Sequence, residues 1–262
     1  MHSLPTDCDR KLARSSLRIT TSWDDGHPSD LRIAELLDKH RLEGTFYIPR
    51  SNCEGRAVMT CAEIASLTPR FEIGGHTQDH VSLTELDPAA ASEQIQSNKF
   101  WLEDVLGREV RGFAYVRGRH NRVVRGLVEK AGYDYARTIK NLMSEPGTDR
   151  MEVPTTMQFF NHAPGVYLRN YMSGGPTVAR LAILGTALGA APLVTRLIRG
   201  AETCASLGGH FHLWGHSWEV DEHDLWRELD VLLGNLSALG AVYVSNADWR
   251  KKPNVVAPSD SN

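Results

Sequence analysis

The chain has 262 residues, of which 41% are hydrophobic and 23% are charged, a balance typical of soluble globular proteins. This length accommodates one α/β domain with a substantial core. The formal net charge of -3 shows no basic excess, which argues against a general nucleic-acid-binding protein. Four cysteines without a CxxC pair predict free thiols, and neither a disulfide framework nor a cysteine-based zinc site.

Strand-like and helix-like segments alternate along the chain. Segments with the length and composition of strands are 17–23, 44–49, 71–76, 110–116, 133–139, 151–158, 210–217 and 241–246. Segments with helical periodicity lie between them: 28–40, 61–68, 87–107, 121–132, 181–198 and 221–240. Within 87–107, Asp87 is the expected N-cap, Pro88 the first helical residue and Gly107 the end.

Repeated strand–helix units of this length imply parallel strands that helices cover. Their number fits an α/β fold with a distorted (β/α) barrel of about seven strands better than an open doubly wound sheet. No linker or shift in composition divides the chain, so we predict a single catalytic domain over 17–249. Residues 1–16 are then an N-terminal extension and residues 250–262 a flexible tail.

No secretory or membrane-spanning segment is visible in the sequence. The N-terminus has no apolar core of a signal peptide, so a cytoplasmic location is expected. The apolar stretch 181–198 has an uncharged part, 181–195, that is shorter than the roughly 20 residues of a spanning helix and contains Pro192. A helix packed on the domain is the favoured interpretation, and an interfacial helix is the alternative.

Acidic residues stand at the end of the first predicted strand, in "TSWDDGHPSD". Successive side chains of a strand point to opposite faces, so Asp24 and Asp25 share one site only where the strand breaks. Gly26 and Pro28 supply such a break. Taken alone, the motif favours a solvated acidic turn. In (β/α) barrels, however, the chemistry lies at the C-terminal ends of the strands.

Histidines occupy two other strand ends. His76 and His80 are four residues apart after the third strand, and together with one carboxylate they form a two-nitrogen, one-oxygen set typical of catalytic divalent metal sites. In the late strand, His210 and His212 are expected to make internal hydrogen bonds. His216 follows Gly215 at the strand terminus and is expected at the mouth of the barrel.

These motifs resemble those of the polysaccharide deacetylase (NodB-homology) family, which is of the carbohydrate esterase type. "TSWDDG" is similar to its "TFDDG" signature, "HTQDH" to its H-[ST]-x-x-H motif and "LWGHSWE" to its late histidine motif, and the resemblance covers about residues 19–246.

The resemblance implies a hydrolase that removes an N-acetyl group from an N-acetylated carbohydrate with the help of one divalent metal ion. Zinc is expected, with cobalt, nickel or manganese as alternatives. By the same resemblance, Asp25, His76 and His80 bind the metal, Asp24 is the general base and His216 is the general acid.

The chain also departs from the family pattern. A main-chain N–H after the fourth strand, near Tyr115 and Val116, is implied as an oxyanion donor. In "FAYVRG", however, Ala114 replaces the family's arginine, and Arg117 is the nearest arginine able to compensate. The family's Asp-x-x-Asp-Trp motif is not recognisable either.

Two residues close to His216 are further candidates for the site. Glu219 is the expected substitute for the missing aspartate that orients this histidine. Trp218, like Trp23 and Trp214, is expected either to stack on a sugar or to pack in the core.

Two other functions remain open from the sequence. One is a related amidohydrolase that cleaves a non-sugar acyl amide. The other is a catalytically silent metal-binding or carbohydrate-binding module, against which the presence of Asp24 argues, because a pure binder needs no base beside its metal. The sequence identifies neither the sugar nor the oligomeric state.

Overall fold

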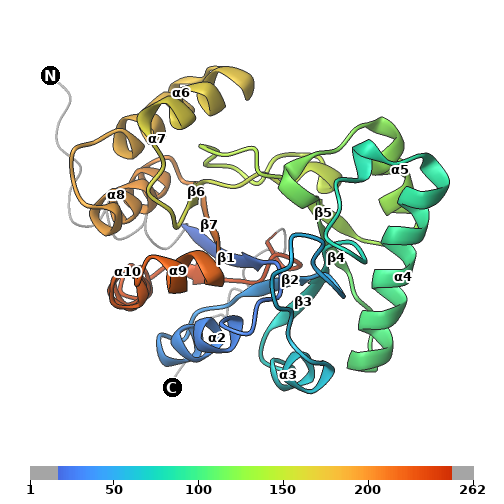
Figure 1. Cartoon of the computed structure of the whole chain (residues 1–262). Coiled ribbons are helices and arrows are strands. Elements are labelled where there is room, and N and C mark those ends of the chain that lie inside the picture. The colour runs from blue at the N-terminus through green and yellow to red at the C-terminus, as the bar shows by residue number, and fades with distance from the viewer. Residues whose placement is uncertain (1–16, 250–262) are drawn as a thin grey trace, which may run out of the picture.

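One curled sheet of parallel strands forms the centre of the computed structural model, which describes residues 17–249 (Figure 1). Hydrogen bonds connect its strands in the order β5-β4-β3-β2-β1-β7-β6, and β8 pairs with β1. The predicted barrel-like α/β fold is therefore confirmed. The strands are β1 (Arg18–Asp24), β2 (Thr45–Ile48), β3 (Glu72–Gly75), β4 (Gly112–Ala114), β5 (Tyr135–Arg137), β6 (Met157–Gln158), β7 (His210–His216) and β8 (Val242–Tyr243). The predicted extension, 1–16, and tail, 250–262, lie outside the described residues.

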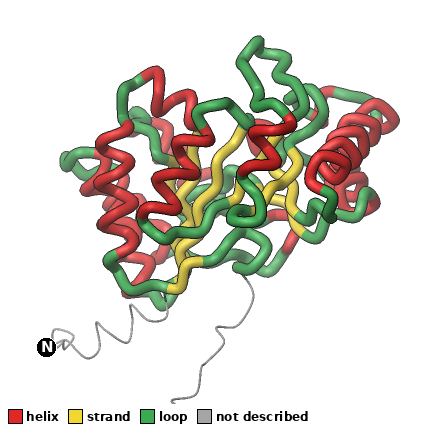
Figure 2. The backbone as a smooth tube through the Cα atoms, turned by 90° about the horizontal axis from the view of Figure 1, so that it is seen from below, coloured by secondary structure: helices red, strands yellow, loops and turns green. Residues whose placement is uncertain are grey.

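Helices flank the sheet, which Figure 2 shows as yellow strands between red helices. None of the helices within 17–249 is long and apolar enough to span a membrane. The longest begins as predicted, because the Asp87 side chain accepts hydrogen bonds from the N–H groups of Ala89 and Ala90, and it ends at the left-handed Gly107. The helices are α2 (Asp30–Lys39), α3 (Cys61–Ser66), α4 (Pro88–Leu106), α5 (Arg122–Lys130), α6 (Pro164–Ser173), α7 (Val178–Ala187), α8 (Leu193–Ser206), α9 (Ser217–Glu222) and α10 (Trp226–Ser237).

The sheet curls into a half-barrel whose edges are β5 and β6. The chain between these strands partly fills the gap, because Thr138 donates its N–H to the Val153 carbonyl and Val153 donates its N–H to the Ala136 carbonyl, both at 2.9 Å. Since the strands are parallel, all their C-terminal ends open on the same side. Asp24 and His216 are directly paired in the register of β1 and β7, which brings two of the predicted site residues together.

The helical region after β6 differs from the sequence prediction. The stretch 181–198 is not one helix: α7 ends at Ala187 and α8 begins at Leu193, directly after Pro192. Proline has no N–H for the helical ladder and favours a helix start, which explains the break. The helix α6 was not predicted. The predicted helix 221–240 is likewise interrupted: α9 already begins at Ser217 and ends at Glu222, and α10 begins after Asp224, whose φ of 49° is left-handed.

Two histidines of β7 lie in the core, as the sequence predicted. His210 is hydrogen-bonded to the Thr20 hydroxyl and His212 to the Ser22 hydroxyl, each through Nε2 at 2.9 Å. Burial disfavours the charged imidazolium and, with the nearby charge of Arg18, lowers the pKa of His210 to about 3. The imidazole is therefore neutral in the folded protein at pH values where it is protonated in the unfolded chain.

We expect this histidine to make the protein acid-sensitive. Its contribution to stability is complete above about pH 6.5 and is lost as the pH falls toward 3, because protons bind preferentially to the unfolded state. His210→Gln should reduce the loss of unfolding free energy between pH 7 and pH 5 by about 2 kcal/mol. Urea denaturation at both pH values measures this, with the exposed His223→Gln as control. An unchanged loss in His210→Gln would show that His210 is not the source.

Candidate active site and metal centre

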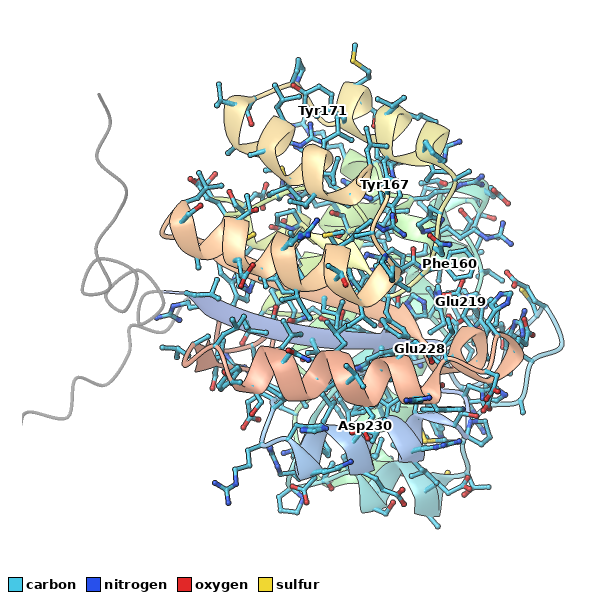
Figure 3. The ribbon with its side chains drawn as sticks, turned by 90° about the vertical axis from the view of Figure 1, so that its left-hand side faces the viewer. Phe160, Tyr167, Tyr171, Glu219, Glu228 and Asp230 are labelled. Carbon is cyan, nitrogen blue, oxygen red and sulfur yellow. The ribbon has the colours of Figure 1, made fainter. Side chains whose placement is uncertain are left out.

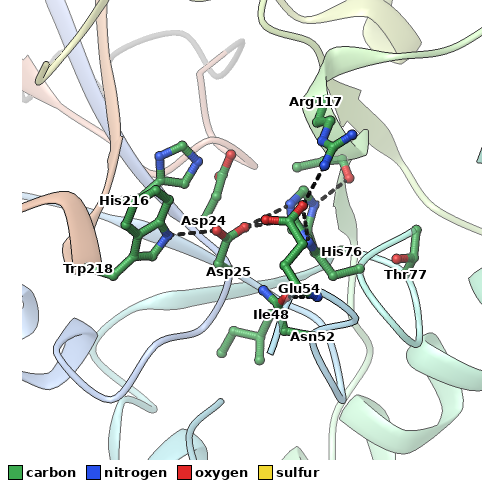
Figure 4. Close-up of polar contacts among 12 residues, drawn as sticks. Asp24, Asp25, Ile48, Asn52, Glu54, His76, Thr77, Arg117, His216 and Trp218 are labelled. Atoms are coloured by element: carbon green, nitrogen blue, oxygen red, sulfur yellow. Dashed lines mark hydrogen bonds and ion pairs between the residues drawn. The ribbon is translucent and has the colours of Figure 1, made fainter. Parts of the chain in front are cut away.

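A carboxylate and two imidazoles converge at the mouth of the half-barrel (Figure 4). The Asp25 Oδ1 atom lies 3.0 Å from His80 Nε2 and 3.5 Å from His76 Nε2, and the ligand atoms of the three residues all lie within 4.8 Å of one another. All three side chains are buried. The residues predicted as metal ligands are thus brought together.

A sharp turn at the end of β1 lets both aspartates face this mouth. Asp24 is the last residue of the strand, and Asp25 and Gly26 both have left-handed backbone conformations, with φ of 77° and 60°. A left-handed aspartate is strained, and such strain concentrates at functional sites. At Gly26 a side chain would also collide with Ile48, since its Cβ would lie 2.7 Å from that side chain.

The two histidines present their Nε2 atoms to Asp25 for local structural reasons. His76 Nδ1 lies 2.8 Å from the Ala114 carbonyl, which requires a proton on Nδ1 and leaves the Nε2 lone pair free. The loop that carries His80 is shaped by left-handed backbone at Thr77 and at His80 itself. The Thr77 hydroxyl holds the loop by accepting a hydrogen bond from the N–H of Val81.

Electrostatics keep Asp25 ionised. Burial alone would raise the pKa of this carboxyl, but contacts with His76 and His80 and the charge of His216 outweigh burial and hold the pKa well below its ordinary value. The Trp218 indole N–H also donates to Asp25 Oδ2 at 2.8 Å. An anionic oxygen and two imidazole nitrogens are therefore available together.

This donor set fits a divalent metal ion. Ligands about 2.0–2.2 Å from one ion lie roughly 3.0–3.5 Å from each other, as Asp25 Oδ1 does from the two imidazole nitrogens. Two nitrogens and one oxygen suit zinc and also accept cobalt, nickel or manganese. Three protein ligands leave coordination positions for water and substrate, as catalytic sites do.

Asp24 is held by an arginine that the sequence analysis did not select. Arg137, at the end of β5, donates from Nη2 to Asp24 Oδ1, and it is fully buried. Its guanidinium also lies 5.2 Å and 5.3 Å from the ring centres of Tyr47 and Trp214. The signal in the sequence was a charged residue inside the apolar fifth strand.

Arg117, the predicted compensating arginine, has a different partner. Its Nη2 donates to Glu54 Oε1 at 2.7 Å, at the rim of the site, and its side chain is 56% exposed. The arginine that binds Asp24 therefore comes from the end of β5 and not from the end of the fourth strand.

His216 is oriented by the residue predicted for that role. Its Nδ1 lies 2.8 Å from Glu219 Oε2, which also accepts a hydrogen bond from the Gln158 amide at 3.0 Å. Burial alone would lower the pKa of His216, but Glu219 and the charges of Asp25 and Asp24 outweigh it and raise the pKa to about 9. The imidazole is therefore protonated at neutral pH, and its Nδ1 proton is committed to Glu219.

Tyr115 and Val116, the predicted oxyanion residues, do not line the pocket. The Tyr115 N–H donates to the Arg137 carbonyl at 3.1 Å, and its hydroxyl donates to the Met151 carbonyl. The Tyr115 N–H is therefore already used within the sheet, because β4 continues pairing with β5 to this position.

The pocket over the site has a volume of about 270 Å³. The faces of Trp218 are covered, because it stacks on His216 and the Arg56 guanidinium lies 3.3 Å from its ring centre. Trp218 thus orients Asp25 and leaves no open face for a sugar, while Trp23 is fully buried in the core. The lining residues are Asp24, Asp25, Glu54, His76, His80, Arg117, Ile139, Gln158, Trp214, His216 and Trp218.

Comparison with known proteins gives a consistent family. The family model "Polysaccharide deacetylase" matches residues 13–136, which include the "TSWDDG" and "HTQDH" motifs. This match confirms the resemblance inferred from the sequence motifs. No curated protein matches the sequence.

Solved structures share the fold at low sequence identity. A Mycobacterium smegmatis protein proposed to be a polysaccharide deacetylase has 14% identity and a TM-score of 0.64, with 94% of this chain and 91% of that chain covered. A family 4 acetyl xylan esterase from Clostridium thermocellum, in complex with a cobalt ion, has 14% identity and a TM-score of 0.53, with 88% and 89% covered. A Streptococcus pyogenes deacetylase in complex with acetate has 16% identity and a TM-score of 0.48. The match covers 52% of this chain and only 62% of that chain.

The ligand assignment predicts how metal content responds to mutation. His76→Ala removes one of three ligands, so the purified variant should retain much less divalent metal than the wild type, whereas Asp24→Asn should keep it. Metal analysis by mass spectrometry after dialysis measures both. Equal metal content in His76→Ala and wild type would reject the site, and loss of metal in Asp24→Asn would mean that the two aspartates have exchanged roles.

Proposed function

Residues 13–136 match the family model of the polysaccharide deacetylases, and on this basis we propose that the chain is a metal-dependent N-deacetylase of an N-acetylated carbohydrate. One observation carries the proposal. Around the Asp25–His76–His80 set stand a carboxylate and a protonated imidazole, Asp24 and His216, on adjacent paired strand ends. This arrangement suits a hydrolysis that needs a general base and a general acid in the same pocket.

Asp25, His76 and His80 would hold the metal, and we propose zinc on the basis of the donor set. A divalent ion bound there would supply Lewis acidity, which lowers the pKa of a water and polarises an amide carbonyl. The structure of the acetyl xylan esterase from Clostridium thermocellum, which shares the fold, contains cobalt, and this is compatible with that donor chemistry.

Asp24 is suited to accept the proton of the attacking water. Arg137 binds its Oδ1, which leaves Oδ2 as the acceptor and fixes the orientation of the carboxylate. Because Asp24 and Arg137 are both buried, few waters compete for this oxygen. The proton that Asp24 takes from the water is available later for return to solvent or to the product amine.

His216 is suited to protonate the departing amine. Glu219 holds its Nδ1 proton, so the Nε2 proton is the one free for transfer. An amine leaves poorly unless it is protonated, which gives the acid its importance in amide cleavage. The presence of both a base and an acid favours catalysis over a silent binding module.

The substrate class follows from the family and is tested by product release. We expect the metal-loaded protein to release acetate from at least one member of a panel of N-acetylated sugars and short glycans, with Asp24→Asn as the inactive control. Enzymatic acetate detection measures turnover. Cleavage of simple acyl amides in preference to every sugar would instead assign the chain to the non-sugar amidohydrolases.

His216→Ala separates the acid from a merely structural histidine. General acid catalysis is worth about 10² to 10⁴ in rate, so the variant should lose amide turnover by about that factor and keep its metal. Acetylated aryl esters have leaving groups that need little protonation, so their turnover should fall much less. Equal losses on amide and ester would contradict the acid role and make His216 a positioning residue.

A further inference from the structure

The helix α7 carries apolar side chains on both its buried and its exposed sides. Ile183 and Leu184 are buried in the contact with the rest of the domain. On the outward side, however, Val178 and Leu181 are 86% and 54% exposed, and Leu188, directly after the helix, is 37% exposed. The solvent-facing side of a surface helix is normally polar or charged.

The neighbouring helix α6 extends this apolar surface. Leu168 and Met172, one helical turn apart, are 48% and 68% exposed, and α6 packs against α7. Both helices stand at the outer edge of the molecule on the β6 side (Figure 1). We call the five residues together the α6–α7 apolar face: Leu168, Met172, Val178, Leu181 and Leu188. A grouping of this kind marks an interaction site more often than scattered single residues do.

The segment that forms this face contains no acidic residue. No aspartate or glutamate occurs between Glu152 and Glu202, where the average density of 32 acidic residues in 262 would place about six. The exposed charged residues of this segment are Arg169 and Arg199. By contrast, α10 carries Glu228 and Asp230, which Figure 3 shows well away from Tyr167 and Tyr171 of α6.

The helix pair is a fixed part of the fold. The buried Arg180 guanidinium donates to the carbonyls of Asn170 and Tyr171 at 2.8 Å, near the end of α6, and to that of Asn141 at 3.2 Å. These bonds tie α6 and α7 to each other and to the loop after β5. The apolar side chains therefore remain on the outside in this arrangement.

We propose that the α6–α7 apolar face is a docking surface for an anionic lipid bilayer. Apolar side chains would enter the headgroup region, and Arg169 of α6 would contact lipid phosphates. A protein partner does not require the absence of carboxylates, whereas an anionic membrane surface repels them. With ten residues, α7 is about 15 Å long, half of the roughly 30 Å hydrocarbon core, so it lies on the bilayer and does not cross it.

Docking there would also orient the active site. The short connection 159–163 joins α6 to Gln158, a residue that lines the pocket and bonds to Glu219. Only five residues therefore separate the pocket lining from the first helix of the docking face. A bilayer on the β6 side would lie beside the mouth and not beneath the opposite end of the sheet.

Co-sedimentation with vesicles tests the proposal. Wild-type protein should pellet with phosphatidylcholine vesicles that contain phosphatidylglycerol, and added salt should weaken the binding. The double variant Met172→Asp/Val178→Asp should lower the partition coefficient at least about tenfold, because two inserted apolar groups become charged. Asp at position 178, the first residue of α7, suits the helix dipole, so the fold should be retained.

Phe100→Asp is the matched control, because Phe100 is a 64% exposed apolar residue on the distant helix α4. It should bind vesicles like the wild type. Wild-type protein that stays in the supernatant with these vesicles would overturn the proposal. The proposal would also be overturned if the wild type failed to bind vesicles and formed a dimer that the double variant dissociates. The face would then bind a second copy of the chain. The co-sedimentation assay contains no substrate, so its outcome is independent of the proposed deacetylase activity. The double variant should also release acetate from a soluble substrate at the wild-type rate.

Discussion

The buried ion pair between Asp24 and Arg137 connects the central strand of the sheet to an edge strand, across the mouth where the site forms. Both side chains are almost completely removed from solvent. Burying two charges costs several kcal/mol for each ion before their mutual attraction is counted. The pair is therefore a constraint on the structure as much as a source of stability, since removal of either partner leaves an uncompensated buried charge.

The other features of the site follow from this constraint. Because Arg137 occupies one oxygen of Asp24, the second oxygen has a defined direction. Asp25 turns away through its left-handed backbone and meets His76 and His80. His216 is paired with Asp24 in the register of β1 and β7, and its Nδ1 is hydrogen-bonded to Glu219. The site thus separates the three tasks of metal binding, proton acceptance and proton donation among neighbouring strand ends, which a parallel half-barrel brings to one side.

Local patterns in the sequence predicted much of this arrangement. The aspartate pair with its glycine break and the two histidines four residues apart are short motifs whose geometry is set within a few residues. The same is true of Glu219, three residues after His216. Arg137 could not be found in this way, because its partner lies 113 residues earlier and only the curvature of the sheet brings them together. Tyr115 failed for the same reason, since the pairing of β4 with β5 decides whether its N–H is free. The division of 181–198 was readable at Pro192, whereas α6 has no clear polar–apolar period and was missed.

The most direct test of this account is a double-mutant cycle on Asp24 and Arg137, measured as free energy of unfolding in urea. Arg137→Met alone should destabilise the protein by about 3–5 kcal/mol, because it leaves Asp24 buried without a partner. Asp24→Asn should likewise strand Arg137, and the double variant should cost less than the sum of the two by at least about 1 kcal/mol. Additivity within about 0.5 kcal/mol would contradict the account, because it would mean that the two buried charges do not depend on each other.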